Sequence, residues 1–199
     1  MHPLNSVKGA IVIGFVIAIV IAVLVEPGIQ FSMLSLARWL HIISGVMWIG
    51  LLYYFNVVQI PGLAVAGADT GGPGGAGISK YIAPRALLWF RWAALATWLT
   101  GAWYLGPNFV SAFTLGLLLP DPSTYFMVIG IGAWLGTIML INVWAVIWPN
   151  QKKVLGITPA SDAEKAAARN TAKYASRINF ILSIPMLMCM GGAMHGLPF

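Results

Sequence analysis

The stretch that decides the fold is Ala37-Arg38-Trp39-Leu40-His41-Ile42-Ile43-Ser44-Gly45-Val46-Met47-Trp48-Ile49-Gly50. It lies in an apolar run over about residues 31–58, which is long enough to cross a bilayer as a helix. Ionisable side chains within such a helix are costly, and by default they mark a functional site. Arg38 and His41 are three residues apart and therefore share one helical face, which Gly45 and Trp48 continue.

The composition is that of an integral membrane protein. Of the 199 residues, 59% are hydrophobic and 8% are charged, whereas soluble domains average roughly 25% charged residues. The net charge of +6 does not indicate nucleic-acid binding, because the basic residues suit cytoplasmic loops. The single cysteine, Cys189, excludes an internal disulfide and a Cys-x-x-Cys-His attachment of c-type heme, so any cofactor must be held non-covalently.

Apolar segments of sufficient length predict five membrane-spanning helices in an all-α, polytopic bundle, which we interpret as a single transmembrane domain over residues 1–199. The segments are residues 9–26, 33–58, 86–106, 124–148 and 178–197. The first lacks a convincing cleavage site, and we expect it to remain as an uncleaved span. Residues 109–119 are too short to cross, and we expect them to lie at the interface or to dip in and return.

Local signals mark several boundaries. Pro149 is expected to stop the fourth helix, and the glycine-rich loop over residues 61–84 is expected to be a flexible linker. Ser161 and Glu164 form a capping-box pattern, which predicts a short cytoplasmic helix over residues 161–174 leading into the last span. Gly132 and Gly136 are spaced so that a neighbouring helix can approach closely.

The distribution of basic residues predicts the orientation. If the N-terminus is cytoplasmic, the following residues all fall on the cytoplasmic side: Lys8, Lys80, Arg85, Lys152, Lys153, Lys165, Arg169, Lys173 and Arg177. The opposite loops contain Glu26 and Asp121 and neither Lys nor Arg. We therefore predict a multi-pass membrane protein with a cytoplasmic N-terminus and a C-terminus on the opposite side of the membrane.

Two histidines are predicted at nearly the same depth. His41 lies about 24 Å from Val57 and His195 about 26 Å from Ile178, at 1.5 Å per residue. Facing imidazoles can ligate a b-type heme, and Arg38 suits a heme propionate. We therefore predict a heme b site with His41 and His195 as metal ligands, and with Arg38, Gly45 and Trp48 around the cofactor. A hydrogen-bonded packing role for His41 is the alternative.

The last span also contains a stripe of methionines. Met186, Met190 and Met194 recur every four residues and share a helical face with one another. Soft thioether ligands favour Cu(I), which makes copper handling an alternative function. Methionine is equally a common packing residue in helix bundles.

Four blocks of sequence occur in one order. They are Arg38-Trp39-Leu40-His41 with Gly45 and Trp48-Ile49-Gly50, followed by Tyr54-Phe55; Trp89-Phe90-Arg91-Trp92 with Ala96-Thr97-Trp98-Leu99-Thr100-Gly101; Thr137-Ile138-Met139 with Asn142 and Pro149-Asn150-Gln151-Lys152; and Ser176-Arg177 with Asn179 and Leu182-Ser183-Ile184-Pro185. Together they resemble the membrane N-terminal domain of bacterial cytochrome-linked urate oxidases, without the cytochrome c domain of those proteins. The segment around His41 is also similar to integral-membrane protoporphyrinogen oxidases and to copper-resistance membrane proteins.

The resemblance implies an oxidoreductase-associated bundle in the bacterial inner membrane, with a periplasmic C-terminus, that communicates with a c-type cytochrome. It carries over His41 and Arg38. The predicted function is thus a heme-binding membrane subunit in electron transfer toward a periplasmic c-type cytochrome. The alternatives are a non-catalytic accessory subunit of a larger membrane respiratory or oxidoreductase complex, and a copper-handling protein. The expected partners are membrane lipid and either other membrane subunits or a c-type cytochrome. No hydrolytic triad or zinc spacing is visible in the sequence, so whether the chain is itself an enzyme stays open.

Overall fold

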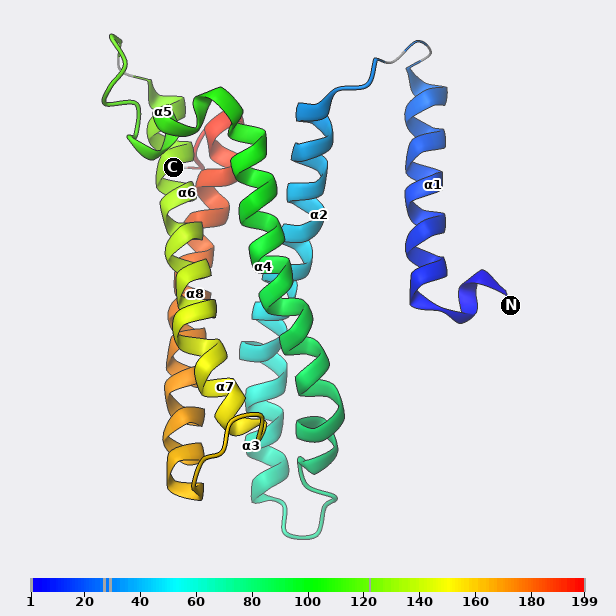
Figure 1. Cartoon of the computed structure of the whole chain (residues 1–199), viewed down its shortest axis with the longest axis vertical. Helices are drawn as coiled ribbons and strands as arrows, with labels where there is room; N and C mark the ends of the chain where they lie inside the picture. The colour runs from blue at the N-terminus through cyan, green and yellow to red at the C-terminus, as the bar shows by residue number, and fades with distance from the viewer. Residues whose placement is uncertain (1, 27, 29, 122, 199) are drawn as a thin grey trace. The chain divides into compact units, whose positions relative to one another are not determined.

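The computed structural model describes residues 2–26, 28, 30–121 and 123–198, and every regular element in these ranges is a helix (Figure 1). The all-α prediction is thereby confirmed. The chain divides into two compact units, Met1–Met33 and Leu34–Phe199. In the first unit, a short 3-10 turn η1 (Pro3–Asn5) precedes helix α1 (Val7–Val25). The Ser6 hydroxyl caps α1 by accepting a hydrogen bond from the Gly9 amide at 3.0 Å.

The second unit is a bundle of long helical stretches that run side by side (Figure 1). In chain order the elements are α2 (Met33–Tyr53), the π segment η2 (Tyr54–Gln59), α3 (Ile60–Ala68), the π segment η3 (Ile78–Ile82), α4 (Ala83–Leu105), the 3-10 turn η4 (Gly106–Asn108), α5 (Phe109–Phe113), α6 (Thr124–Ile141), the π segment η5 (Asn142–Ile147), α7 (Trp148–Val154) and α8 (Asp162–His195). We name its two ends the cavity end, where α2 begins and α8 ends, and the α7–α8 end, where α7 ends and α8 begins.

Several helices are longer than the sequence predicts. The second predicted span continues through η2 and α3 to Ala68, and the fourth continues through η5 and α7 to Val154. Pro149 was expected to stop the fourth helix, and that prediction is wrong. Pro61 and Pro149 each lie in the first turn of an α segment that follows a π turn, where the missing N–H is least costly. The non-helical part of the predicted linker shortens to residues 69–75.

The predicted capping box is confirmed at the start of α8. The Ser161 hydroxyl accepts from the Glu164 amide at 3.3 Å, and the Glu164 carboxylate accepts from the Ser161 amide at 2.7 Å. The helix that begins there runs without interruption to His195 and includes Pro185. Residues 161–174 are therefore the first turns of α8 and not a separate helix.

Four helical stretches are long and apolar enough to cross a membrane: Val7–Val25, Met33–Ala68, Thr124–Val154 and Asp162–His195. The predicted class of membrane protein with transmembrane helices is supported by them. α4 is not among the four, because its 23 residues include two arginines and four tryptophans, which lower its mean hydropathy. The fifth span and the orientation therefore stay predictions.

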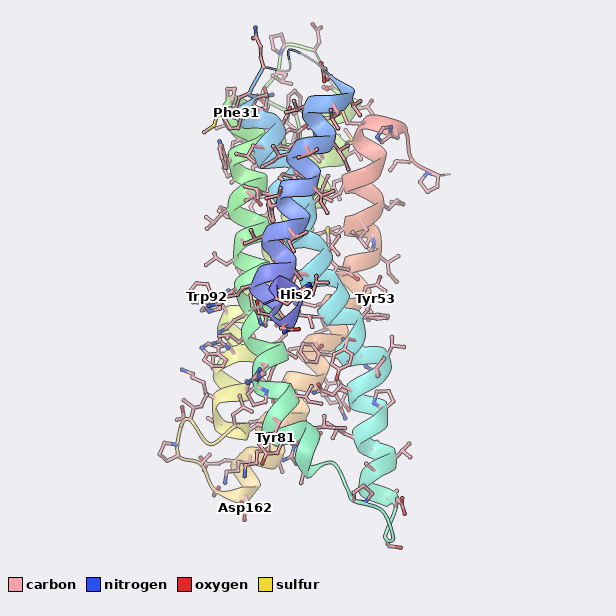
Figure 2. The ribbon with its side chains drawn as sticks, turned by 90° about the vertical axis from the view of Figure 1, so that its right-hand side faces the viewer. His2, Phe31, Tyr53, Tyr81, Trp92 and Asp162 are labelled. Carbon is pink, nitrogen blue, oxygen red and sulfur yellow. The ribbon has the colours of Figure 1, made fainter. Side chains whose placement is uncertain are left out.

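A layer of polar side chains joins the helices in the middle of the second unit. The Asn56 amide donates to Ser176 Oγ at 2.9 Å, the Asn142 amide donates to Asn179 Oδ1 at 2.8 Å, and the Asn179 amide donates to the Met139 carbonyl at 3.0 Å. The Ser183 hydroxyl lies 3.4 Å from Tyr53 Oη, on the flank of the bundle where Figure 2 labels Tyr53. Lipid tails provide little hydrophobic drive for helix association, so such bonds fix the position of α8 against α2 and α6. We call these residues the polar layer.

Candidate functional site

A cavity of about 390 Å³ lies between the polar layer and the cavity end of the second unit. Its walls come from α2, α4, α5, α6 and α8, and almost all of its lining atoms are apolar. His41, Gly45 and Trp48 of the predicted site all line it. The helical face that carries His41, Gly45 and Trp48 therefore forms one wall of a partly open cavity.

The imidazole of His41 has a defined tautomer. Its Nδ1 atom lies 2.8 Å from the carbonyl oxygen of Thr97 on α4. A carbonyl can only accept, so the ring proton is on Nδ1, and Nε2 keeps its lone pair. A histidine that ligates a metal commonly donates its other ring N–H to a backbone carbonyl in this way, which fixes the orientation of the ring. This hydrogen bond is compatible with metal ligation through Nε2 and equally with the hydrogen-bonded packing role that is the alternative for His41. The cavity lies beside the ring.

Glycines make room for the ring and for the cavity. A Cβ atom on Gly101 would lie 2.9 Å from Nδ1 and from Cε1 of His41, so α4 can approach the ring only because this residue has no side chain. A Cβ atom on Gly45 would make an ordinary contact with the Thr97 methyl group at 3.7 Å. On Gly136, which lines the cavity from α6, a Cβ atom would meet nothing within 4 Å.

The two glycines of the predicted close-approach pair have different surroundings. A Cβ atom on Gly132 would lie 3.1 Å from Cys189 Cβ and 3.3 Å from Met190 Cε, so this residue permits close packing of α6 on α8. Gly136, one turn further, opens onto the cavity instead. The predicted close approach is confirmed at Gly132 alone.

Aromatic side chains close the cavity near the start of α5. Phe109 and Phe113 line it and stack on one another with ring centroids 4.4 Å apart. The Trp134 indole N–H of α6 donates to the Phe113 carbonyl at 2.9 Å and anchors the short helix. The segment predicted to dip in and return therefore contributes wall residues to the cavity.

Two predicted site residues lie elsewhere. Arg38 is exposed one turn before His41 on α2, and His195 is exposed at the last position of α8; neither lines the cavity. The methionine stripe divides, since Met186 and Met190 line the cavity whereas Met194 is 70% exposed. In the described ranges, no three His, Cys, Asp or Glu side chains come together as a metal site.

The sequence interpretation missed the contribution of α4. Thr97 and Gly101 belong to the sequence blocks of the resemblance, but neither was predicted to contact His41. The Thr97 carbonyl fixes the His41 tautomer, and Gly101 makes room for the ring. Their signal in the sequence is a small residue four positions after a threonine in an apolar segment. That pattern is common in membrane helices and does not by itself point to a site.

The fold and the cavity define a class: a helical bundle with membrane-length helices around an apolar pocket that contains one imidazole. Residues 109–198, from α5 to beyond the end of α8, match the family model described as urate oxidase N-terminal. The predicted resemblance to this membrane domain is confirmed over that part of the chain. α2 and α4 lie outside the match, so the assignment of His41 rests on its own geometry. No curated protein and no solved structure matches the chain.

Proposed function

We propose that this chain is an integral membrane subunit that binds a b-type heme through His41 and passes electrons toward a c-type cytochrome. The observation that supports the proposal most is the His41–Thr97 hydrogen bond, which leaves Nε2 as a free lone pair beside an apolar cavity. Ligation of a heme iron through Nε2 requires that tautomer.

The residues of the cavity fit a heme. The volume of about 390 Å³ lies within the usual range of small-molecule sites, roughly 300–1,000 Å³, and the wall is apolar and aromatic. Besides His41, the cavity is lined by Met186 and Met190, and either thioether would be a suitable second ligand for a heme iron. His195, the predicted second ligand, remains a candidate beside these methionines.

Bound there, a heme would supply one-electron redox chemistry. The protein's part follows from its residues. His41 binds and the Thr97 carbonyl orients the ring, while Phe109 and Phe113 exclude water from one end of the cavity. Arg38, which is exposed one turn before His41, is the residue that we propose would pair with a heme propionate.

The predicted topology completes the proposal. α4 has 23 residues, about 34 Å at 1.5 Å per residue, which is enough to cross a hydrocarbon core of about 30 Å as a fifth span. With a cytoplasmic N-terminus in a bacterial inner membrane, the cavity falls in the periplasmic half of the bilayer. Electrons leaving it would then reach a periplasmic cytochrome by the shorter route.

The decisive experiment is a pyridine hemochrome spectrum of the detergent-purified protein. We expect about one heme b per chain, with loss of the heme in His41→Ala and retention in the control His2→Ala. His195→Ala tests the second ligand: an altered spectrum assigns that role to His195, and an unchanged one leaves it to the methionines. A carefully prepared sample without a Soret band would contradict heme binding and favour the accessory-subunit alternative.

Copper is the second candidate, because His41, Met186 and Met190 line the same cavity and are ligands of the type that Cu(I) prefers. The volume of the cavity far exceeds the needs of one ion, which favours heme. Metal analysis after anaerobic loading with Cu(I) separates the two. Stoichiometric copper that His41→Ala abolishes, in a protein that takes up no heme, would reverse the preference.

A further inference from the structure

Two cations lie near one indole ring toward the α7–α8 end. The guanidinium carbon of Arg91, on α4, lies 3.7 Å from the centroid of the Trp148 ring, and the ammonium of Lys152 lies 5.9 Å from the same ring. Trp148 and Lys152 are one turn apart on α7. We call these three residues the Trp148 cation site. It is formed by two helices that lie far apart in the sequence.

The positive charge of this site has no counter-ion among the residues that the structure describes. The chain has only five acidic residues, and the one ion pair found among the described residues joins Lys165 to Asp162 at 3.6 Å. Arg91 and Lys152 therefore have no carboxylate within pairing distance in the part of the chain that the structure describes. Two neighbouring cations at the boundary of a bilayer favour an anion supplied from outside the chain.

An apolar groove begins one helical turn from these cations. The groove is shallow and open on its outer side, and it is lined by Leu95 of α4, Leu140 and Ile141 of α6, and Trp144 of η5. The Trp92 ring packs edge-on against Trp144, with centroids 5.4 Å apart. Figure 2 shows Trp92 projecting from the flank of the bundle, farther from the α7–α8 end than Tyr81 and Asp162. The groove is thus on the outer surface of the second unit.

The spacing joins the two features. Leu95 follows Arg91 by one turn on α4, and Trp144 precedes Trp148 by one turn on the η5–α7 stretch. On α4, Leu95 lies at the groove and Arg91 lies one turn closer to the α7–α8 end. On the η5–α7 stretch, Trp144 lies at the groove and Trp148 lies one turn closer to that end. A ligand that fits both must have a negative group attached to an apolar chain.

We propose that this surface binds an anionic phospholipid, with the phosphate at Arg91 and Lys152 and one acyl chain in the groove between α4 and α6–η5. Charge complementarity selects an anionic over a zwitterionic headgroup, because the latter brings its own cation to a site that already has two. The proposal depends on the membrane location of the chain and not on heme binding.

Lipid selectivity can be measured with the full chain in nanodiscs. Phosphatidylglycerol and phosphatidylcholine with brominated acyl chains would be compared as quenchers of tryptophan fluorescence, with Trp144→Phe identifying the groove signal. We expect phosphatidylglycerol to quench at a lower mole fraction. Each of Lys152→Gln and Arg91→Gln should weaken that preference about fivefold, the equivalent of one basic residue near an anionic surface.

Matched variants separate a site from general surface charge. Arg169→Gln with Lys173→Gln removes two cations from α8 and should leave the preference intact; an equal loss would overturn the proposal. Lys152→Gln leaves the Arg91–Trp148 contact in place and covers the case in which Arg91→Gln fails to fold. Equal quenching by phosphatidylglycerol and phosphatidylcholine would also overturn the proposal. So would displacement of phosphatidylglycerol by inorganic phosphate alone, because the acyl chain would then contribute nothing to binding.

Discussion

The α-carbon of Gly101 faces the imidazole of His41 so closely that a single added methyl group would lie 2.9 Å from two ring atoms. The ring is thereby confined between α2 and α4. Its Nδ1 atom faces the carbonyl of Thr97, which is on α4 like Gly101. Position and tautomer of His41 are thus both set by α4. This relationship can be perturbed without removing the imidazole itself.

Gly101→Ala is expected to displace the His41 ring and weaken its hydrogen bond to Thr97. Overpacking of this kind costs about 1–3 kcal/mol, and in the proposed holoprotein it should lower heme occupancy although the histidine is retained. Gly191→Ala is the matched control, because a Cβ atom there meets nothing within 4 Å. Heme content and thermal unfolding of the two variants would be compared. Equal behaviour would argue against His41 as a positioned ligand.

Gly136→Leu is expected to fill the cavity from α6. A Cβ atom on Gly136 enters open space, so the larger side chain can occupy the cavity without displacing the backbone. Ligand content should fall several-fold while helicity by circular dichroism stays unchanged. Gly191→Leu adds the same side chain on α8 at a residue that does not line the cavity. If both variants retain full heme content, the ligand lies elsewhere.

Met186→Leu and Met190→Leu test which thioether acts as an axial ligand. If a methionine sulfur binds the iron, one of these variants should lose the sulfur-to-iron charge-transfer band and show a lower reduction potential. Met194→Leu is the control, since Met194 is exposed outside the cavity. Optical spectra would measure the charge-transfer band of each variant, and redox titrations would measure its reduction potential. Unchanged spectra in both cavity variants would exclude methionine ligation.

Asn179→Leu is expected to destabilise the bundle by about 1–2 kcal/mol. Asn179 is fully buried, donates to the Met139 carbonyl and accepts from Asn142, so leucine would remove two bonds between α8 and the α6–η5 stretch. Asn170→Leu makes the same change at an exposed position of α8. Unfolding in mixed micelles would compare the two. A loss in Asn170→Leu as large as in Asn179→Leu would show that the polar layer contributes little.

The helical class and most span positions are predictable from the sequence, because a long apolar segment has few other stable structures in a bilayer. The helix ends were less predictable. Proline ordinarily ends a helix, but Pro61 and Pro149 both follow π turns that alter the local hydrogen-bond pattern. No residue pattern in the sequence predicts those turns.

The candidate site was predictable on α2 and not across the bundle. Arg38 and His41 share a face within one helix, and spacing alone indicates this. Which partners face His41 depends on the rotation of α4 and α8 about their axes, which depth does not determine. Matching depths therefore led to His195, whereas the structure brings Thr97 and Gly101 to the ring and Met186 to the same cavity.

The polar layer holds α8 to its neighbours by hydrogen bonds over only part of the length of the helix. The hydrogen bonds found between described residues of α8 and other helices involve residues 175–183, and Pro185 follows, whose ring nitrogen cannot donate to the preceding turn. Beyond it, the turns that contain Met186 and Met190 are held by apolar contacts. Displacing them breaks no interhelical hydrogen bond of the layer. The wall of the cavity that α8 provides therefore depends on the close apolar packing of Cys189 and Met190 against Gly132, and not on hydrogen bonds.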